Sequence, residues 1–155
     1  MRDTKEAFHW IIRILKKYEV PYQISGGLAA KIYGSSRPLA DIDIDISEEK
    51  FVDILPDVKP YIIFGPERFR NENFDLSLIT LNYMGQEIDL CSQHVKIRDA
   101  KTGEWHDNST DFSRYELQEV YDITIPVIKK DDLVNYKKIL GRPVDLEDIK
   151  QMSHV

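Results

Sequence analysis

Apolar residues return every three or four positions in several segments of the chain, and this spacing predicts amphipathic helices. The first helix is predicted after Asp3, which can cap it, and it ends before Pro21. Its apolar stripe consists of Phe8, Ile11, Ile12, Leu15 and Tyr18. Further helices are predicted over residues 28–33, 48–55, 131–140 and 143–152, with Pro56 ending the second of these and Gly141 the third.

Other segments alternate between apolar and polar residues or are rich in β-branched residues, which predicts strands. Strands are expected at residues 22–25, 41–46, 61–64, 74–83 and 87–91, and Gly65-Pro66 is expected to end the third of them. Residues 67–73 read as a charged loop, 96–111 as a polar hairpin or loop, and 119–129 as one or two strands broken at Pro126. This mixture predicts an α/β (α+β) fold, a mixed β-sheet flanked by helices, in a single domain over residues 1–155.

The segment at residues 41–46 reads DIDIDI and is the most unusual feature of the sequence. Side chains alternate along a strand, so Asp41, Asp43 and Asp45 face one side while the isoleucines face the other. Aspartate is depleted in strands, and like charges about 7 Å apart along one face repel each other. A strand that accumulates them usually has a cation to bind.

Three interpretations of this segment compete. It could be a solvated sheet face, although such faces are more often mixtures of Lys, Thr and Glu. It could be a calcium loop of the EF-hand type, but that loop needs Gly at its sixth position and Glu at its twelfth, where this chain has Ile46 and Val52. It could be a carboxylate site for a hard divalent cation such as magnesium, with phosphate oxygens completing the coordination.

The residues that precede this segment favour the third interpretation. Ser25, Gly26 and Gly27 stand between a predicted strand and the helix expected near Leu28. Two glycines let the backbone turn sharply and approach a ligand closely, and a helix N-terminus offers unpaired N–H groups that suit phosphate. A Gly-Gly pair is a weak signal alone, but here it is followed, after thirteen intervening residues, by an Asp-x-Asp strand.

Together these residues resemble the nucleotidyltransferase superfamily related to DNA polymerase beta, in particular its small stand-alone members. In that family a Gly-Gly or Gly-Ser turn precedes Asp-x-Asp, and a later strand supplies a third carboxylate between apolar residues. Gly26-Gly27, Asp41-Ile42-Asp43 and Ile88-Asp89-Leu90 match these positions. The second glycine departs from the serine that many members use to contact phosphate, and Ser25 or Ser35 could take that place.

The resemblance implies a metal-dependent enzyme that moves a nucleoside monophosphate group from a nucleoside triphosphate to a hydroxyl acceptor. The catalytic and metal-binding residues would be Asp41, Asp43 and Asp89, with Mg²⁺ or Mn²⁺ as cofactor. The residues implied in nucleotide binding are Ser25, Gly26, Gly27, Ser35, Arg37 and Lys137. Arg37 could equally neutralise an aspartate, and the sequence leaves the roles of Asp45 and of residues 96–111 open.

The acceptor is not encoded in a recognisable motif, and the short chain suggests that a partner protein or a homodimer contributes to its binding. An alternative function is a catalytically silent binding module with the same fold, such as an antitoxin-like subunit that acts on a partner protein. The presence of all three carboxylates favours the enzyme.

Composition and charge exclude several other classes of protein. The formal net charge of −6 argues against broad binding to nucleic acid, but not against a nucleotide bound through a metal ion. No run of 18 apolar residues and no basic-then-apolar leader occurs, so neither a membrane span nor secretion is predicted. The single cysteine, Cys91, excludes an internal disulfide and fits a cytoplasmic protein.

Overall fold

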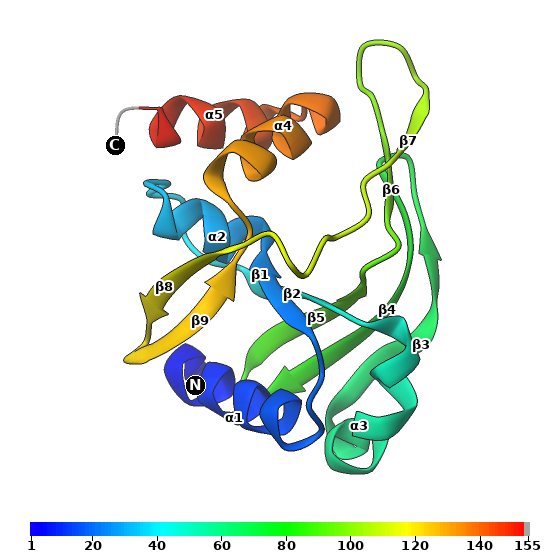
Figure 1. Ribbon diagram of the computed structural model, residues 1–155, viewed down its shortest axis with the longest axis vertical. Helices are drawn as coiled ribbons and strands as arrows, with labels where there is room; N and C mark the ends of the chain where they lie inside the picture. Colours follow the sequence, from blue (N-terminus) through cyan, green and yellow to red (C-terminus); the bar gives the residue numbers. More distant parts are fainter. Residues whose placement is uncertain (154–155) are drawn as a thin grey trace.

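The structure is a computed structural model that describes residues 1–153, and Figure 1 shows its helices and strands. The helices are α1 (Thr4–Lys17), α2 (Gly26–Ile32), α3 (Phe51–Val58), α4 (Lys130–Leu140) and α5 (Pro143–Met152), with single 3₁₀ turns at Glu48–Lys50 and Lys59–Tyr61. The strands are β1 (Tyr22–Ser25), β2 (Asp41–Ile46), β3 (Ile62–Arg70), β4 (Phe74–Tyr83), β5 (Gln86–Ser92), β6 (Lys96–Arg98), β7 (Trp105–Asp107), β8 (Glu116–Val120) and β9 (Ile123–Val127).

The nine strands assigned within residues 1–153 form one mixed sheet. Its order is β7-β6-β4-β5-β2-β1-β9-β8, and β3 pairs with the outer side of β4. β2 runs parallel to β5, and β1 runs parallel to β9, whereas the other pairs are antiparallel. The predicted α/β class with a mixed sheet and flanking helices is therefore confirmed.

Much of the hydrophobic core lies on the face of the sheet that is covered by α1 and α3 (Figure 1), and the core also includes Leu28 of α2, Leu133 of α4 and Met152 of α5. Ile42, Ile44 and Ile46 of β2 are fully buried in this core together with Phe8 and Ile11 of α1. Because neighbouring side chains on a strand face opposite ways, burial of the three isoleucines turns the aspartates of β2 toward the other face. Hydrophobic packing thus fixes the direction of the acidic residues.

The opposite side of the sheet is framed by α2, by the stacked helices α4 and α5, and by the β6–β7 hairpin (Figure 1). Gly141 ends α4 in a left-handed conformation at φ 59°, as the sequence predicts for a helix stop. The N–H of Ala100, in the turn between β6 and β7, donates to the carbonyl of Ile139 over 3.1 Å. The hairpin is therefore tied to the end of α4.

Three of the boundaries that differ from the sequence prediction lie in β3, in α3 and at the turn between β8 and β9. β3 continues through Gly65-Pro66 to Arg70, because it is an edge strand whose register with β4 shifts around that pair, and edge strands tolerate proline and charge. Pro56 lies on the exposed side of α3, and the buried stripe of that helix continues past it to Val58. The strands β8 and β9 turn at Tyr121-Asp122, where both residues have positive φ, rather than at Pro126.

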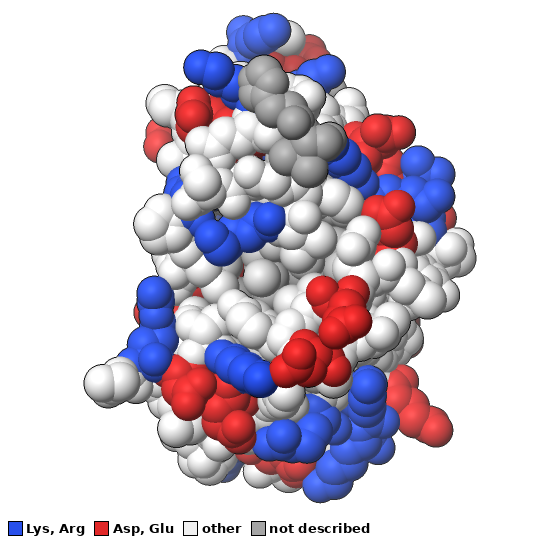
Figure 2. Space-filling model, turned by 90° about the vertical axis from the view of Figure 1, so that its left-hand side faces the viewer, with Lys and Arg blue, Asp and Glu red and all other residues white. Residues whose placement is uncertain are grey.

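Figure 2 shows the side of the molecule on which β8 lies in Figure 1. Acidic and basic side chains are interspersed on this face and do not gather into a single basic surface over it. Within residues 1–153, no helix combines the length and the apolar character needed to cross a membrane.

Candidate active site

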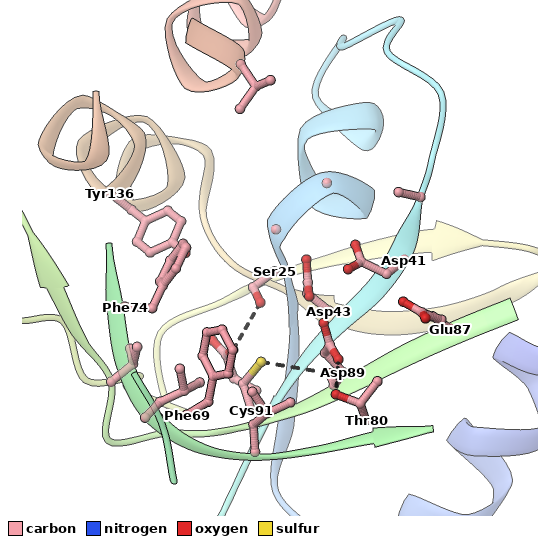
Figure 3. A pocket seen from close by; sticks show the side chains of 18 of the residues that line it. Ser25, Asp41, Asp43, Phe69, Phe74, Thr80, Glu87, Asp89, Cys91 and Tyr136 are labelled. Carbon is pink, nitrogen blue, oxygen red and sulfur yellow. Dashed lines mark hydrogen bonds between the residues drawn. The ribbon is translucent and has the colours of Figure 1, made fainter. Parts of the chain in front are cut away.

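Three carboxylates converge on the open face of the sheet from two neighbouring strands. β2 and β5 are parallel and in register, with Asp43 opposite Asp89 and Asp41 opposite Glu87. One oxygen atom each of Asp41, Asp43 and Asp89 lies within 4.8 Å of the others. In Figure 3 these carboxylates point toward one another. The three carboxylates that the resemblance groups together therefore lie together in the structure.

The cluster is electrostatically unfavourable without a counter-charge. Burial, followed by the charges of Asp41 and Asp89, holds the pKa of Asp43 well above its usual value, although an N–H from Gly27 partly opposes the shift. Burial also raises the pKa of Asp89 to about 6, against a hydrogen bond of 2.7 Å that the Thr80 hydroxyl donates to its Oδ1. A bound cation would stabilise the ionised form of all three groups.

The two glycines before the acidic strand have different surroundings. They form the first turn of α2, which begins at Gly26 rather than near Leu28. Gly26 has φ +58°, and a Cβ atom there would lie 2.0 Å from Oδ2 of Asp43. Gly27 faces open space, since a Cβ there would meet only Leu39 at 3.8 Å and Arg37 at 4.0 Å. Gly26 therefore makes room for Asp43, and Gly27 leaves the cavity unobstructed.

Asp45, whose role the sequence leaves open, is held by hydroxyl groups. Its Oδ1 accepts a hydrogen bond from Ser25 over 3.0 Å, and its Oδ2 accepts one from Thr110 over 2.8 Å. Burial raises the pKa of Asp45 to about 6, and the two hydrogen bonds oppose that rise. Gln23, its neighbour on β1, donates to the carbonyls of Asp111 and Arg114. Asp45 thus anchors the segment after β7 to the sheet and lies outside the three-carboxylate cluster.

A cavity of about 600 Å³ lies above the cluster. Eight of the nine site residues predicted from the sequence line it, namely Ser25, Gly26, Gly27, Arg37, Asp41, Asp43, Asp89 and Lys137. Ser35 does not line the cavity: it is buried and donates its hydroxyl to Asp148 over 2.8 Å. Ser35 is therefore outside the cavity lining, although it shares the carboxylate of Asp148 with Arg37 and Lys137.

Ser35 belongs to a buried ion network that joins the end of α2 to α4 and α5. Lys137, which is 2% exposed, lies 3.1 Å from Asp148 and 3.4 Å from Asp145. Arg37 donates to Asp148 over 2.7 Å. Burial alone would raise the pKa of Asp148, but the hydrogen bonds from Arg37, Ser35 and Lys137 outweigh it and lower the pKa to about 2.

Arg142 completes this network through a hydrogen bond of 2.7 Å to Asp145. Three cations, Arg37, Lys137 and Arg142, thus share two carboxylates, so that the network retains an excess of one positive charge. All three cations line the cavity. The arrangement can attract an anion while the two carboxylates keep the cations in place.

Sequence reasoning missed the apolar half of the cavity. Phe64, Phe69, Phe74, Leu76, Leu78 and Tyr136 line it together with the polar groups. In Figure 3, Phe69, Phe74 and Tyr136 stand on the far side of Ser25 from the carboxylates. One signal was present in the sequence: Phe74, Leu76, Leu78 and Thr80 alternate along β4, and the pairing of Thr80 with Asp89 puts them on the acidic face.

The sequence matches no protein-family model and no curated protein sequence. Among solved structures, a proposed nucleotidyltransferase of Thermotoga maritima, TM1012, is similar with a TM-score of 0.70 and 20% identity, covering 99% of this chain and 96% of that chain. The lincosamide antibiotic adenylyltransferase LnuA, with lincomycin bound, has a TM-score of 0.63 and 17% identity, covering 98% of this chain and 97% of its own.

A third similar structure is ANT(2″)-Ia in complex with adenylyl-2″-tobramycin. It has a TM-score of 0.59 and 15% identity, and the alignment covers 97% of this chain and 87% of that chain. At these identities the similarity establishes a shared fold. The resemblance inferred from Gly26-Gly27 and the Asp-x-Asp strand is thereby confirmed in the fold, which is that of small nucleotidyltransferases.

Proposed function

We propose that this protein is a metal-dependent nucleotidyltransferase that moves a nucleoside monophosphate group from a nucleoside triphosphate to a hydroxyl acceptor. One observation carries the proposal: three carboxylates whose oxygens lie within 4.8 Å of one another share a cavity with the first turn of α2 and three cations. Acidic and basic groups that line one cavity suit a metal-bound triphosphate.

The three carboxylates fit a hard divalent cation such as Mg²⁺ or Mn²⁺. The donor set consists of oxygen atoms alone, which is the preference of these ions. Burial and mutual repulsion raise the pKa of both Asp43 and Asp89, and a cation would relieve that repulsion. When bound, the ion would polarise the attacking hydroxyl and neutralise charge on the phosphates.

The residues of the chain divide the remaining work. Gly27 leaves space at the N-terminus of α2 for phosphate oxygens, and Arg37 and Lys137 present positive charge on the same side of the cavity. Asp89 accepts the proton of the acceptor hydroxyl, because its Oδ1 is oriented by Thr80 while its carboxylate faces the cluster.

Calorimetry with ATP, GTP, CTP and UTP tests this function. Binding of at least one triphosphate should require Mg²⁺ or Mn²⁺ and disappear in EDTA. Gly27→Val should fold and lose that binding, because its side chain would occupy the open space beside Arg37. The control is Lys16→Val, at an exposed position of α1 that does not line the cavity.

Full triphosphate binding in EDTA would contradict the metal requirement. Unchanged triphosphate binding by Gly27→Val would show that the phosphates do not bind at the first turn of α2. Failure of all four triphosphates to bind with Mg²⁺ would favour the silent binding module instead.

A further inference from the structure

An apolar wall lies beside the carboxylate cluster and has no role in the steps described above. It is formed by Phe64 and Phe69 of β3 and by Leu76 and Leu78 of β4. Phe69 pairs directly with Leu76 across the two strands. The rings of Phe64 and Phe69 meet edge to face, with centroids 6.2 Å apart. These side chains offer a dry surface to a ligand that already occupies the cavity.

The position of this wall relative to the three carboxylates decides whether it faces the triphosphate or the acceptor. On β4, Thr80 comes two residues after Leu78 on the same face and donates to Asp89, so the wall begins next to that carboxylate. The first turn of α2 follows β1, on the other side of β2. In the sheet order β4-β5-β2-β1, the strands that carry the three carboxylates, β5 and β2, therefore separate β4 of the wall from β1, which leads into the turn of Gly27.

Phosphoryl transfer places the attacking and leaving oxygens roughly in line. If pyrophosphate leaves toward Gly27 and Arg37, the attacking hydroxyl enters from the opposite side, over β5 and β4. In that step the acceptor oxygen bonds to the α-phosphorus, the bond from this phosphorus to the bridging oxygen breaks, and the acceptor proton passes to Asp89. The acceptor body then lies against the apolar wall.

The charges around the wall narrow the chemistry of the acceptor. Among the described residues that line the cavity, β3, β4 and the turn between them contribute Phe64, Phe69, Asn71, Phe74, Leu76, Leu78 and Thr80, none of which is charged. An acceptor with several ammonium groups would find no carboxylate on these elements, because Glu87 of β5, which also lines the cavity, pairs with Asn82 and so lies beyond Thr80 from the wall. A nucleic acid would find no cation for its phosphates, since Arg37, Lys137 and Arg142 lie with α2, α4 and α5.

We infer that the acceptor is a small uncharged alcohol or phenol whose hydroxyl is carried on an apolar ring or chain. This inference rests on the proposed nucleotidyl transfer and specifies its substrate class. The apolar wall binds the ring, and the side-chain NH₂ group of Asn71 can donate to a substituent, since its Oδ1 accepts from the backbone of Asn73 and Phe74. Burial of apolar area supplies the affinity and the hydroxyl supplies the reacting atom.

A panel of four hydroxyl compounds tests the inference. Each is titrated by calorimetry into the protein with Mg²⁺ and the inert analogue α,β-methylene-ATP. In a separate assay, each is incubated with ATP that is labelled at its α-phosphate, so that transfer to the acceptor can be detected. The compounds are 2-naphthylmethanol, neutral maltotriose, the glucosamine trimer with its three ammonium groups, and a short RNA with a free 3′-hydroxyl. The naphthyl alcohol should bind most tightly and receive the label.

Variants of the wall locate the binding. Phe69→Ala should lower the affinity for 2-naphthylmethanol roughly tenfold. Phe69→Leu should retain most of that affinity, which would exclude a general loss of folding as the cause. Ile63→Ala is the matched control, because Ile63 belongs to the same strand, is 57% exposed and does not line the cavity.

The outcomes separate this inference from the proposed function. Preference for the glucosamine trimer, maltotriose or RNA, with Mg²⁺-dependent ATP binding intact, overturns the acceptor class alone. If Phe69→Ala loses as much affinity for ATP as for 2-naphthylmethanol, the wall binds the nucleobase, and the inferred acceptor class is overturned. Absence of triphosphate binding in the parent protein contradicts the function itself, whereas binding of the naphthyl alcohol remains measurable without nucleotide.

Discussion

The two adjacent glycines of α2 should respond in opposite ways to the same substitution by alanine. At Gly26 a methyl group would lie 2.0 Å from Oδ2 of Asp43, and 2.7 Å and 2.8 Å from its Cγ and Cβ. Rotation of the Asp43 side chain cannot relieve all three contacts, because its Cβ is fixed by β2. Either the strand or the helix must move, and the carboxylate then leaves the cluster.

The expected magnitudes follow from the backbone. A residue with a Cβ costs roughly 1–2 kcal/mol in the left-handed conformation that Gly26 adopts at φ +58°, and the steric conflict with Asp43 adds to this. A total of about 3 kcal/mol corresponds to a melting temperature lowered by roughly 6–12 °C in a chain of this size. Gly27→Ala should instead stabilise the fold by about 0.5–1 kcal/mol, because alanine restricts the unfolded chain and has room here.

Urea unfolding in EDTA measures both effects without any contribution from metal. Manganese binding, followed by electron paramagnetic resonance, should fall strongly in Gly26→Ala and stay at the parent level in Gly27→Ala. Equal stability of the two variants would refute the close packing of Gly26 on Asp43. Normal manganese binding in a destabilised Gly26→Ala would show that Asp43 is dispensable as a ligand.

Three further predictions concern the acidic groups. Asp89→Asn should have a higher melting temperature than the parent in EDTA at pH 8, and Mg²⁺ should raise that temperature less than it does in the parent. Two charges within 4.8 Å repel by about 3 kcal/mol at an effective dielectric near 20, and solvent and salt reduce this repulsion to about 1 kcal/mol. A lower melting temperature with a normal response to Mg²⁺ would contradict this reasoning. Asp148 has its pKa lowered from 3.8 to about 2, so its contribution of about 2 kcal/mol is complete above the unfolded pKa and is lost as the pH falls through 2. In urea unfolding, Asp148→Asn should therefore be less stable than the parent at pH 7, and the two free energies of unfolding should converge near pH 2. The control is Asp122→Asn, at a carboxylate that is 74% exposed, and its stability should differ little from that of the parent at any pH. A difference for Asp148→Asn that does not change with pH would show that the ionisation of Asp148 does not contribute to stability. Thr110→Val leaves one oxygen of Asp45 without its partner and should destabilise the fold by about 1–2 kcal/mol, with faster amide hydrogen exchange over residues 108–115; unchanged exchange would mean that Asp45 does not anchor this segment.

Local patterns were sufficient to predict the acidic half of the site. Alternation along residues 41–46 separates aspartates from isoleucines whatever the rest of the fold does, and Ile88-Asp89-Leu90 carries the same signal. The parallel register that sets Asp43 opposite Asp89 depends on how two distant strands pair, which a single sequence does not specify. The sequence therefore marks the three carboxylates, but their convergence on one face follows only from the pairing of β2 with β5.

The basic network illustrates a different limit. Asp145 and Asp148 lie on a short helix with modest amphipathic character, and acidic residues in such a helix usually face solvent. Both are fully buried because Lys137 from α4 and Arg37 from the α2–β2 loop supply their partners. A sequence shows each of these charges but not that elements more than a hundred residues apart bring Arg37 and Asp148 together.

The apolar wall was hidden by a misleading local signal. Gly65-Pro66 predicts the end of a strand, so the residues after it read as a charged loop. In the fold the register shift absorbs this pair, and Phe69 returns to the cavity face while Arg68 binds Asp75 outside it. The long-range pairing with β4 outweighs the local preference.

Anomalous diffraction from crystals grown with Mn²⁺ and α,β-methylene-ATP would test the central claim most directly. The account predicts manganese peaks between the carboxylates of Asp41, Asp43 and Asp89, with the triphosphate extending from them toward Gly27 and Arg37. Manganese bound elsewhere, or a triphosphate bound away from these carboxylates, would contradict it.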